Sequence, residues 1–302
     1  MTENVRDRLL VSTAWLAEHL NDPALRIVDL RGLVATRTDD RGVQQAAYHG
    51  ARDRYDTGHI PGAIYVDWTQ DIVNKEDPVP AQAATAEQLR AFLESLGIGD
   101  EHTIVAYCDH PTCQFSTRFW WLMNLYGNDH TRVLDGGFTK WQREGRPITT
   151  EVPRHPPARF TPQPRPYLRV ELDDVRSLLS RPTVCILDAR DPGQYTGSIR
   201  RGAFGGHIPG AINVPREALI DEERGTFRSA AELARIFTPT GVHDSERIVA
   251  YCNGGVAATS VLFALALQGV PLERLANYDG SWNEWGNRID VPHQEGAQPP
   301  GT

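Results

Sequence analysis

The sequence of 302 residues contains only four cysteines. Four are too few for a disulfide framework in a chain of this length, so each is expected to be a small buried side chain or a reactive thiol. No apolar run is long enough to cross a bilayer, and the first residues lack the apolar segment and cleavage site of a signal peptide. These absences predict a cytoplasmic protein with no membrane partner.

Basic side chains nowhere form a cluster, and the formal net charge is −8 at pH 7. Nucleic acid and anionic membranes bind clustered positive charge, so neither is expected as a partner. The cysteines do not show the paired spacing of a zinc site, and no glycine-rich nucleotide-binding motif occurs. We therefore predict that the protein has no metal and no cofactor.

What the sequence does contain is an internal repeat. Four motifs occur twice in the same order: a strand-like run ending in DLR at 31 and DAR at 190, GHIPGAI from 58 and 206, IVAYC ending at 108 and 252, and DGGFTKW or DGSWNEW ending at 141 and 285. The last two pairs share one offset, 252 − 108 = 285 − 141 = 144. The chain is therefore interpreted as a tandem duplication.

The repeat predicts two domains, residues 1–149 and 171–302, joined by a proline-rich linker at 150–170. Short apolar runs such as RIVDL and RIVAYC alternate with helical stretches, for which Thr85 and Ser229 are suitable N-caps. This alternation predicts an α/β fold in which each domain is a parallel sheet flanked by helices. Sites in such sheets form at the carboxyl ends of the strands, where both IVAYC cysteines lie.

The segment after Cys252 reads as a strand, a tight loop and a buried helix. Gly254 and Gly255 allow successive amide hydrogens to point inward as an anion-binding nest, to which the helix adds its positive end. A thiol held there is expected to have a lowered pKa and to react as a thiolate. The alternative is that Cys252 is a buried structural cysteine.

The order of GHIPGAI, the strand-ending cysteine and YDGSWNEW resembles the rhodanese family, and the duplication resembles its two-domain thiosulfate and 3-mercaptopyruvate sulfurtransferases. The resemblance implies an active loop near the domain interface. It implies that Cys252 accepts sulfane sulfur as a persulfide and passes it to a thiol or cyanide acceptor. A thioredoxin-like reductant is a further possible partner.

The loop after Cys252 is the expected substrate-binding segment: Asn253, Gly254, Gly255, Val256 and Ala257. It lacks the basic residues of thiosulfate-type loops and is closer to the Cys-Gly-Ser-Gly-Val-Thr loop of mercaptopyruvate-type relatives. The serine of that loop is replaced by Gly254. The resemblance therefore favours 3-mercaptopyruvate as the sulfur donor. The alternatives are thiosulfate, or a protein-persulfide relay or sensor without small-molecule turnover.

Three further residues are candidates for substrate binding by the same resemblance. Arg200 is similar to a family arginine that binds the donor carboxylate, whereas a second such arginine is replaced near Gln194. Arg190 matches the family's strand-end DxR element, and His59 matches a first-domain histidine near the site. Each has a structural alternative: a surface arginine, an ion-pair partner and a histidine that only holds its loop.

The first-domain cysteine, Cys108, is expected to be inactive. Asp109 would raise the pKa of the thiol, and Pro111 removes an amide donor from the loop. This loop is also two residues longer than its counterpart before the next matched glycine. Cys108 and Cys113 are either two structural thiols or a regulatory disulfide.

A phosphatase is the main rival among enzymes with a strand-end cysteine. That chemistry requires an arginine six residues after the nucleophile. Ala258 occupies this position after Cys252, and Gln114 occupies it after Cys108. The required arginine is absent after both cysteines, so the sequence argues against a phosphatase.

Overall fold

Two five-stranded sheets form the framework of the computed structural model, which describes residues 5–297. The strand order is β1-β7-β6-β2-β5 in the first sheet and β8-β14-β13-β9-β10 in the second, and every pairing within them is parallel. The first sheet comprises β1 (Leu10–Val11), β2 (Leu25–Asp29), β5 (Ala63–Tyr65), β6 (Thr103–Tyr107) and β7 (Thr131–Leu134). The second comprises β8 (Arg169–Val170), β9 (Val184–Asp188), β10 (Ile212–Asn213), β13 (Arg247–Tyr251) and β14 (Leu275–Tyr278). The predicted fold class is confirmed.

Helices cover both faces of each sheet. In the first half they are α1 (Val5–Leu9), α2 (Thr13–His19), α3 (Arg52–Thr57), α4 (Ala86–Ser95), α5 (Gln114–Leu125) and α6 (Gly137–Arg143). In the second half they are α7 (Leu172–Leu178), α8 (Pro192–Thr196), α9 (Ala230–Phe237), α10 (Ala258–Leu267) and α11 (Ser281–Trp285), with short 3-10 helices η1 (Pro166–Leu168), η2 (Arg216–Leu219), η3 (Thr238–Thr240) and η4 (Leu272–Arg274). The two predicted N-caps, Thr85 and Ser229, both form capping boxes.

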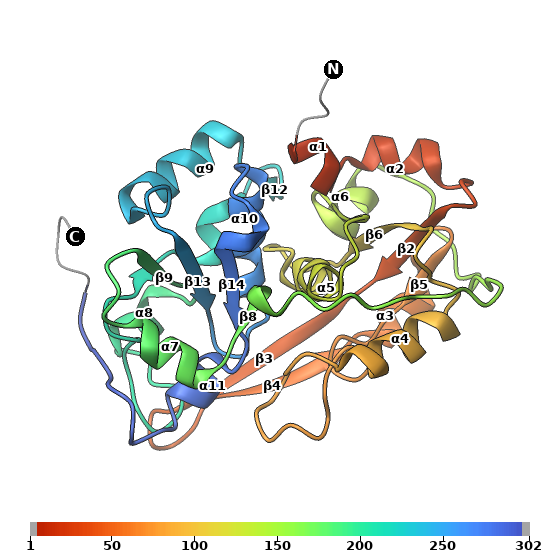
Figure 1. Ribbon diagram of the computed structural model, residues 1–302. Helices are drawn as coiled ribbons and strands as arrows, with labels where there is room; N and C mark the ends of the chain where they lie inside the picture. The colour runs from red at the N-terminus through yellow and green to blue at the C-terminus, as the bar shows by residue number, and fades with distance from the viewer. Residues whose placement is uncertain (1–4, 298–302) are drawn as a thin grey trace.

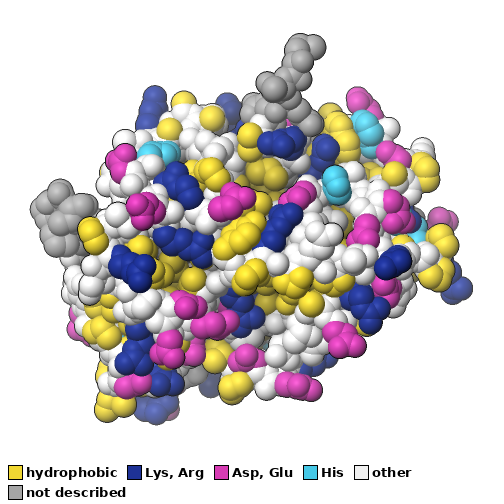
Figure 2. Space-filling view, viewed as in Figure 1, with side chains coloured by type: hydrophobic (Ala, Val, Ile, Leu, Met, Phe, Trp, Pro, Cys, Tyr) yellow, Lys and Arg dark blue, Asp and Glu magenta, His cyan; other side chains and the backbone are white. Residues whose placement is uncertain are grey.

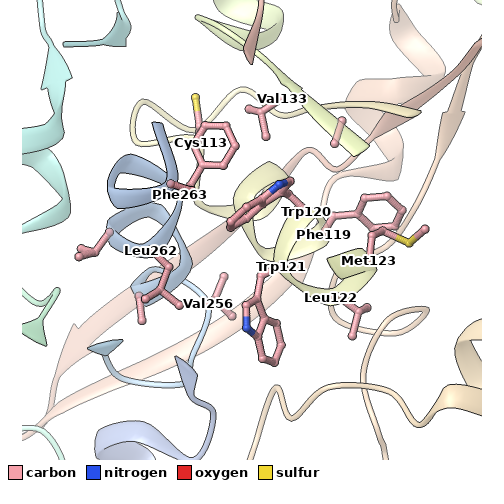
Figure 3. Close-up of a cluster of buried hydrophobic side chains, with 14 of the residues drawn as sticks. Cys113, Phe119, Trp120, Trp121, Leu122, Met123, Val133, Val256, Leu262 and Phe263 are labelled. Carbon is pink, nitrogen blue, oxygen red and sulfur yellow. The ribbon is translucent and has the colours of Figure 1, made fainter. Parts of the chain in front are cut away.

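The cores of the two halves merge across their interface. Helices α5 and α10 pack against each other, and every residue of both helices is buried. Trp120 of α5 meets Phe263 of α10 edge to face, with ring centroids 4.9 Å apart (Figure 3). One continuous cluster of buried side chains therefore joins the inner faces of both sheets, whereas the outer face of each sheet has a separate cluster.

A long antiparallel hairpin, β3 (Gly32–Thr38) and β4 (Gln44–Gly50), leaves the first domain and runs along the second (Figure 1). Near its tip, the amide of Gln44 donates to the carbonyl of Arg200 at 2.8 Å. This hairpin was not predicted from the sequence. Its strands are partly exposed and mix polar with small or apolar residues, so they lack the continuous apolar pattern that reveals a core strand.

The predicted linker, residues 150–170, has no helix or strand up to residue 165. Its Phe160 is buried in the shared core, so the segment is fixed to the protein surface. Its last residues form η1 and β8, the edge strand of the second sheet. The surface in Figure 2 carries interspersed acidic and basic side chains. Between residues 5 and 297, no helix combines the length and apolar character required to span a membrane.

Candidate active site

Cys252 lies directly after β13 and before α10, at the carboxyl end of the second sheet. Its side chain is buried. Within the described chain, the amide hydrogens of Asn253, Gly254, Val256 and Ala257 have no hydrogen-bond acceptor. Buried amides are nearly always paired, so a cluster of free donors at the start of a helix is a site suited to an anion.

Ser281 holds the loop in shape from the neighbouring DGSW motif. Its hydroxyl accepts hydrogen bonds from the amides of Cys252, at 3.1 Å, and Gly255, at 3.0 Å. It donates in turn to the carbonyl of Tyr278 at 2.7 Å. The DGSW motif was recognised in the sequence, but no role was predicted for its serine.

Gly255 allows the loop to turn tightly over Asp279. Its φ of +70° lies in the left-handed region, and a Cβ at this position would be 2.5 Å from Oδ1 of Asp279. Both conditions require glycine.

Replacing Gly255 with alanine is therefore expected to distort the loop and to abolish sulfur loading. Gly269→Ala is the matched control, since Gly269 has a φ of +81° but open space around its Cβ position. The control should lose only the backbone contribution, about 1 kcal/mol of unfolding free energy, whereas Gly255→Ala should lose more. Denaturant unfolding and intact-mass measurement of both variants check this. Equal effects would show that contact with Asp279 does not constrain the loop.

A buried ion pair between the two domains supports the loop after Cys252. Arg118 of α5 donates to the carboxylate of Asp279, and also to the carbonyl of Gly255 at 3.3 Å. The amide of Ala83 donates to the same carboxylate at 2.8 Å. The loop after Cys252 thus lies on a surface to which both domains contribute.

Cys252 lines a cavity of about 260 Å³. The second domain lines it with the predicted loop residues Asn253, Gly254, Val256 and Ala257, together with Asp191, Gln194, Arg201 and Arg216. The first domain adds Val34, Thr36, Gln44 and Tyr48 from the hairpin, and Trp68, His110 and Gln114. A wider outer cavity of about 580 Å³ adjoins it and shares Gln44, Tyr48 and Arg201.

Two neighbouring arginines differ in their position relative to this cavity. Arg200, the predicted ligand, lines only the outer cavity, and its guanidinium donates to the carbonyl of Arg41 at 3.3 Å. Arg201 is buried, lines the cavity that contains Cys252, and donates to the hydroxyl of Tyr48 at 2.9 Å. The adjacent residue is therefore the one placed near the thiol.

Gln194, at the position of the missing family arginine, belongs to a chain of amides. Its Oε1 accepts from Nδ2 of Asn253 at 2.9 Å, and its Nε2 donates to Oε1 of Gln44 in the hairpin at 2.6 Å. These hydrogen bonds connect the loop after Cys252 with the first domain through neutral amide groups.

Arg190 does not line the cavity. It is fully buried, pairs with Asp188 and donates to the carbonyl of Gly206 at 2.7 Å. Arg31 pairs in the same way with Asp29 and with the carbonyl of Gly58, also at 2.7 Å. The DxR element thus forms the same buried network in both domains.

His59 likewise lies away from the cavity. Its ring stacks on Tyr55 with centroids 3.8 Å apart, and its nitrogens contact the carbonyls of Tyr55 and Glu151. His207 stacks on Tyr195 at the same distance. In this structure both histidines hold the loops of their own domains.

Cys108 occupies an environment different from that of Cys252. Burial raises the pKa of the Cys108 thiol and raises that of Cys113 well above its ordinary value. All four cysteines are free thiols, so Cys108 and Cys113 do not form a disulfide here. Inactivity of Cys108 stays a prediction.

Comparisons with known proteins place these features in a family. A model of the rhodanese-like domain matches residues 12–144 and 171–288. The sulfur carrier protein TtuD of Thermus thermophilus is 35% identical, covering 96% of this chain and 98% of TtuD. The 3-mercaptopyruvate sulfurtransferase of Escherichia coli is 33% identical, covering 93% and 96%.

The crystal structure of SseA from Escherichia coli, a 3-mercaptopyruvate sulfotransferase, superposes with a TM-score of 0.76 at 30% identity. The superposition covers 90% of this chain and 98% of SseA. The chain therefore belongs to the rhodanese-like family, in its two-domain form.

Proposed function

We propose that the protein is a sulfurtransferase that carries sulfane sulfur as a persulfide on Cys252. The observation that supports this most directly is the group of unpaired amide hydrogens around a buried cysteine at the start of α10. Such donors stabilise a thiolate and would stabilise the terminal sulfur of a persulfide anion in the same way. No basic side chain of the loop is needed.

In the loading half-reaction, the Cys252 thiolate attacks the sulfur of the donor and a new S–S bond forms. With 3-mercaptopyruvate, the C–S bond breaks and its electron pair leaves on the enolate of pyruvate, which then takes up a proton. With thiosulfate, the S–S bond of the donor breaks and sulfite leaves. Either route leaves Cys252 as a persulfide.

In the discharge half-reaction, an acceptor attacks the terminal sulfur and the Cys252 thiolate is the leaving group. A thiolate acceptor becomes a persulfide, and cyanide becomes thiocyanate. A thioredoxin-like dithiol would release sulfide and become a disulfide. Such an acceptor fits the predicted cytoplasmic location, where thiols are kept reduced.

3-Mercaptopyruvate is the favoured donor. The loop beside Cys252 is neutral, while Arg201 and Arg216 line the same cavity and can bind the donor's carboxylate. Thiosulfate is the second candidate, because its sulfonate-like oxygens suit the same guanidinium groups. A protein-persulfide relay is the third, supported by the similarity to a sulfur carrier protein.

The test is intact-mass spectrometry after brief incubation with 3-mercaptopyruvate or thiosulfate, followed by peptide mapping. Wild-type protein should gain one sulfur atom, about 32 Da, on the peptide that contains Cys252. The compound that loads faster identifies the donor. Absence of any gain would reject a small-molecule donor, and a gain on the Cys108 peptide would reject the assignment to Cys252.

A further inference from the structure

The loop that follows Cys108 crosses to the site of the second domain. Its His110 lines the cavity that contains Cys252. The loop is held by the amide of Cys113, which donates to the carbonyl of His110 at 2.9 Å, and by Ser260 of α10, which donates to the carbonyl of Thr112 at 3.1 Å. A segment equivalent to an active loop in the first half thus forms a wall of the site in the second.

The ring of His110 is held in one tautomer. Its Nδ1 accepts from the backbone amide of Thr112 at 3.2 Å and contacts the hydroxyl of the same residue at 2.9 Å. Since Nδ1 accepts from an amide, the proton of the neutral ring is on Nε2. Within the described residues, this N–H has no protein acceptor. Burial lowers the pKa of His110 to about 4, with a smaller contribution from Arg216, so the ring is neutral at pH 7.

Arg216 lies on the same wall and also has an unused donor. One terminal nitrogen pairs with Glu217 at 2.8 Å, but the buried Nε has no hydrogen-bond partner among residues 5–297. A buried guanidinium nitrogen is normally paired, so Arg216 keeps unused hydrogen-bonding capacity beside this cavity. A neutral N–H group and a cation therefore both line the cavity that contains the thiol.

We propose that His110, a residue of the first domain, donates a hydrogen bond from Nε2 to an anionic oxygen of the sulfur donor at Cys252. The oxygen belongs to the carboxylate or enolate of 3-mercaptopyruvate, or to the sulfonate-like group of thiosulfate. A neutral donor stabilises the charge that develops on the leaving group without giving up its proton. The inference rests on the proposed function and adds a residue from the domain that lacks the active cysteine.

The test compares His110→Phe, which removes the donor, with His110→Gln, which keeps an N–H at similar reach. Loading of Cys252 and discharge of the preformed persulfide to a thiol are timed separately by rapid quench and mass measurement. His110→Phe should load about 10²-fold more slowly, as when one donor to a developing oxyanion is removed. His110→Gln should recover most of this loss, and discharge should stay at the wild-type rate. His243→Phe, at an exposed histidine, is the control.

Loading is measured separately with each sulfur donor, 3-mercaptopyruvate and thiosulfate. Slower loading from both supports a shared oxyanion contact, and slower loading from one identifies whose oxygen is bound. Wild-type loading of His110→Phe from both donors would overturn the proposal. So would an equal loss in loading and discharge that glutamine does not recover, because that pattern reports a structural role.

A binding measurement separates this inference from the proposed function. The side-chain ¹⁵N signals of His110, assigned from their absence in His110→Gln, should show the Nε2–H tautomer and should shift on addition of pyruvate or sulfite. This readout does not require turnover. If wild-type protein loads from neither donor, the proposed function fails, and the presence or absence of the shift still decides the role of His110.

Discussion

Cys252→Ser is expected to eliminate sulfur loading and all transfer to thiol or cyanide. A serine hydroxyl remains protonated near pH 7 and cannot form a persulfide, whereas the fold should be little changed because the side chains have similar volumes. Release of pyruvate or sulfite and formation of thiocyanate measure the loss. An unaltered unfolding midpoint would show that the loss is chemical.

Cys108→Ser is the matched control, because it changes the equivalent cysteine of the first domain. It should keep wild-type loading, since burial raises the pKa of the Cys108 thiol and the fraction of thiolate is correspondingly small. Residual loading of Cys252→Ser that disappears in the double variant would instead identify Cys108 as a second acceptor of sulfur.

Asp279→Asn is expected to cause the largest loss of stability. Arg118 and Asp279 are both buried, so the substitution leaves a guanidinium charge without its carboxylate. Breaking a buried pair on one side costs about 3–5 kcal/mol. The active loop should also lose order, because the same carboxylate lies beneath Gly255. Denaturant unfolding followed by tryptophan fluorescence measures the change.

Asp129→Asn provides the comparison at an exposed ion pair with Arg165. It should change the free energy of unfolding by about 0–1 kcal/mol. The double variant Arg118→Met, Asp279→Leu removes both charges and should recover much of the stability lost by Asp279→Asn. If Asp279→Asn were no more destabilising than Asp129→Asn, the buried pair would not support the interface.

The sequence predicted the parts of the molecule that repeat. The duplicated motifs placed two parallel sheets correctly, because buried strands and capped helices have local patterns. The loop after Cys252 could be described in advance for the same reason. The hairpin over the site could not, because β3 and β4 pair with each other and only a few of their side chains, such as Val34 and Tyr48, pack against the core.

The direction of individual side chains was the second feature that could not be predicted from the sequence. Arg200 and Arg201 are adjacent, and only the position of the backbone relative to the hairpin decides which one lies near Cys252. For Arg190 and His59, the repeat itself contained evidence for a structural role that the prediction did not use. Each has a counterpart at the same motif position in the other half, and a residue required by both halves serves the fold before it serves one site.

The helix pair at the interface has a consequence for the history of the chain. After a duplication, one copy is ordinarily free to be lost or to drift. Here α10 has no solvent-facing side, so the second half alone would expose an apolar surface where α5 now lies. The first domain thus covers a surface that the second cannot leave exposed, so loss of the first copy is expected to destabilise the second, whatever Cys108 does.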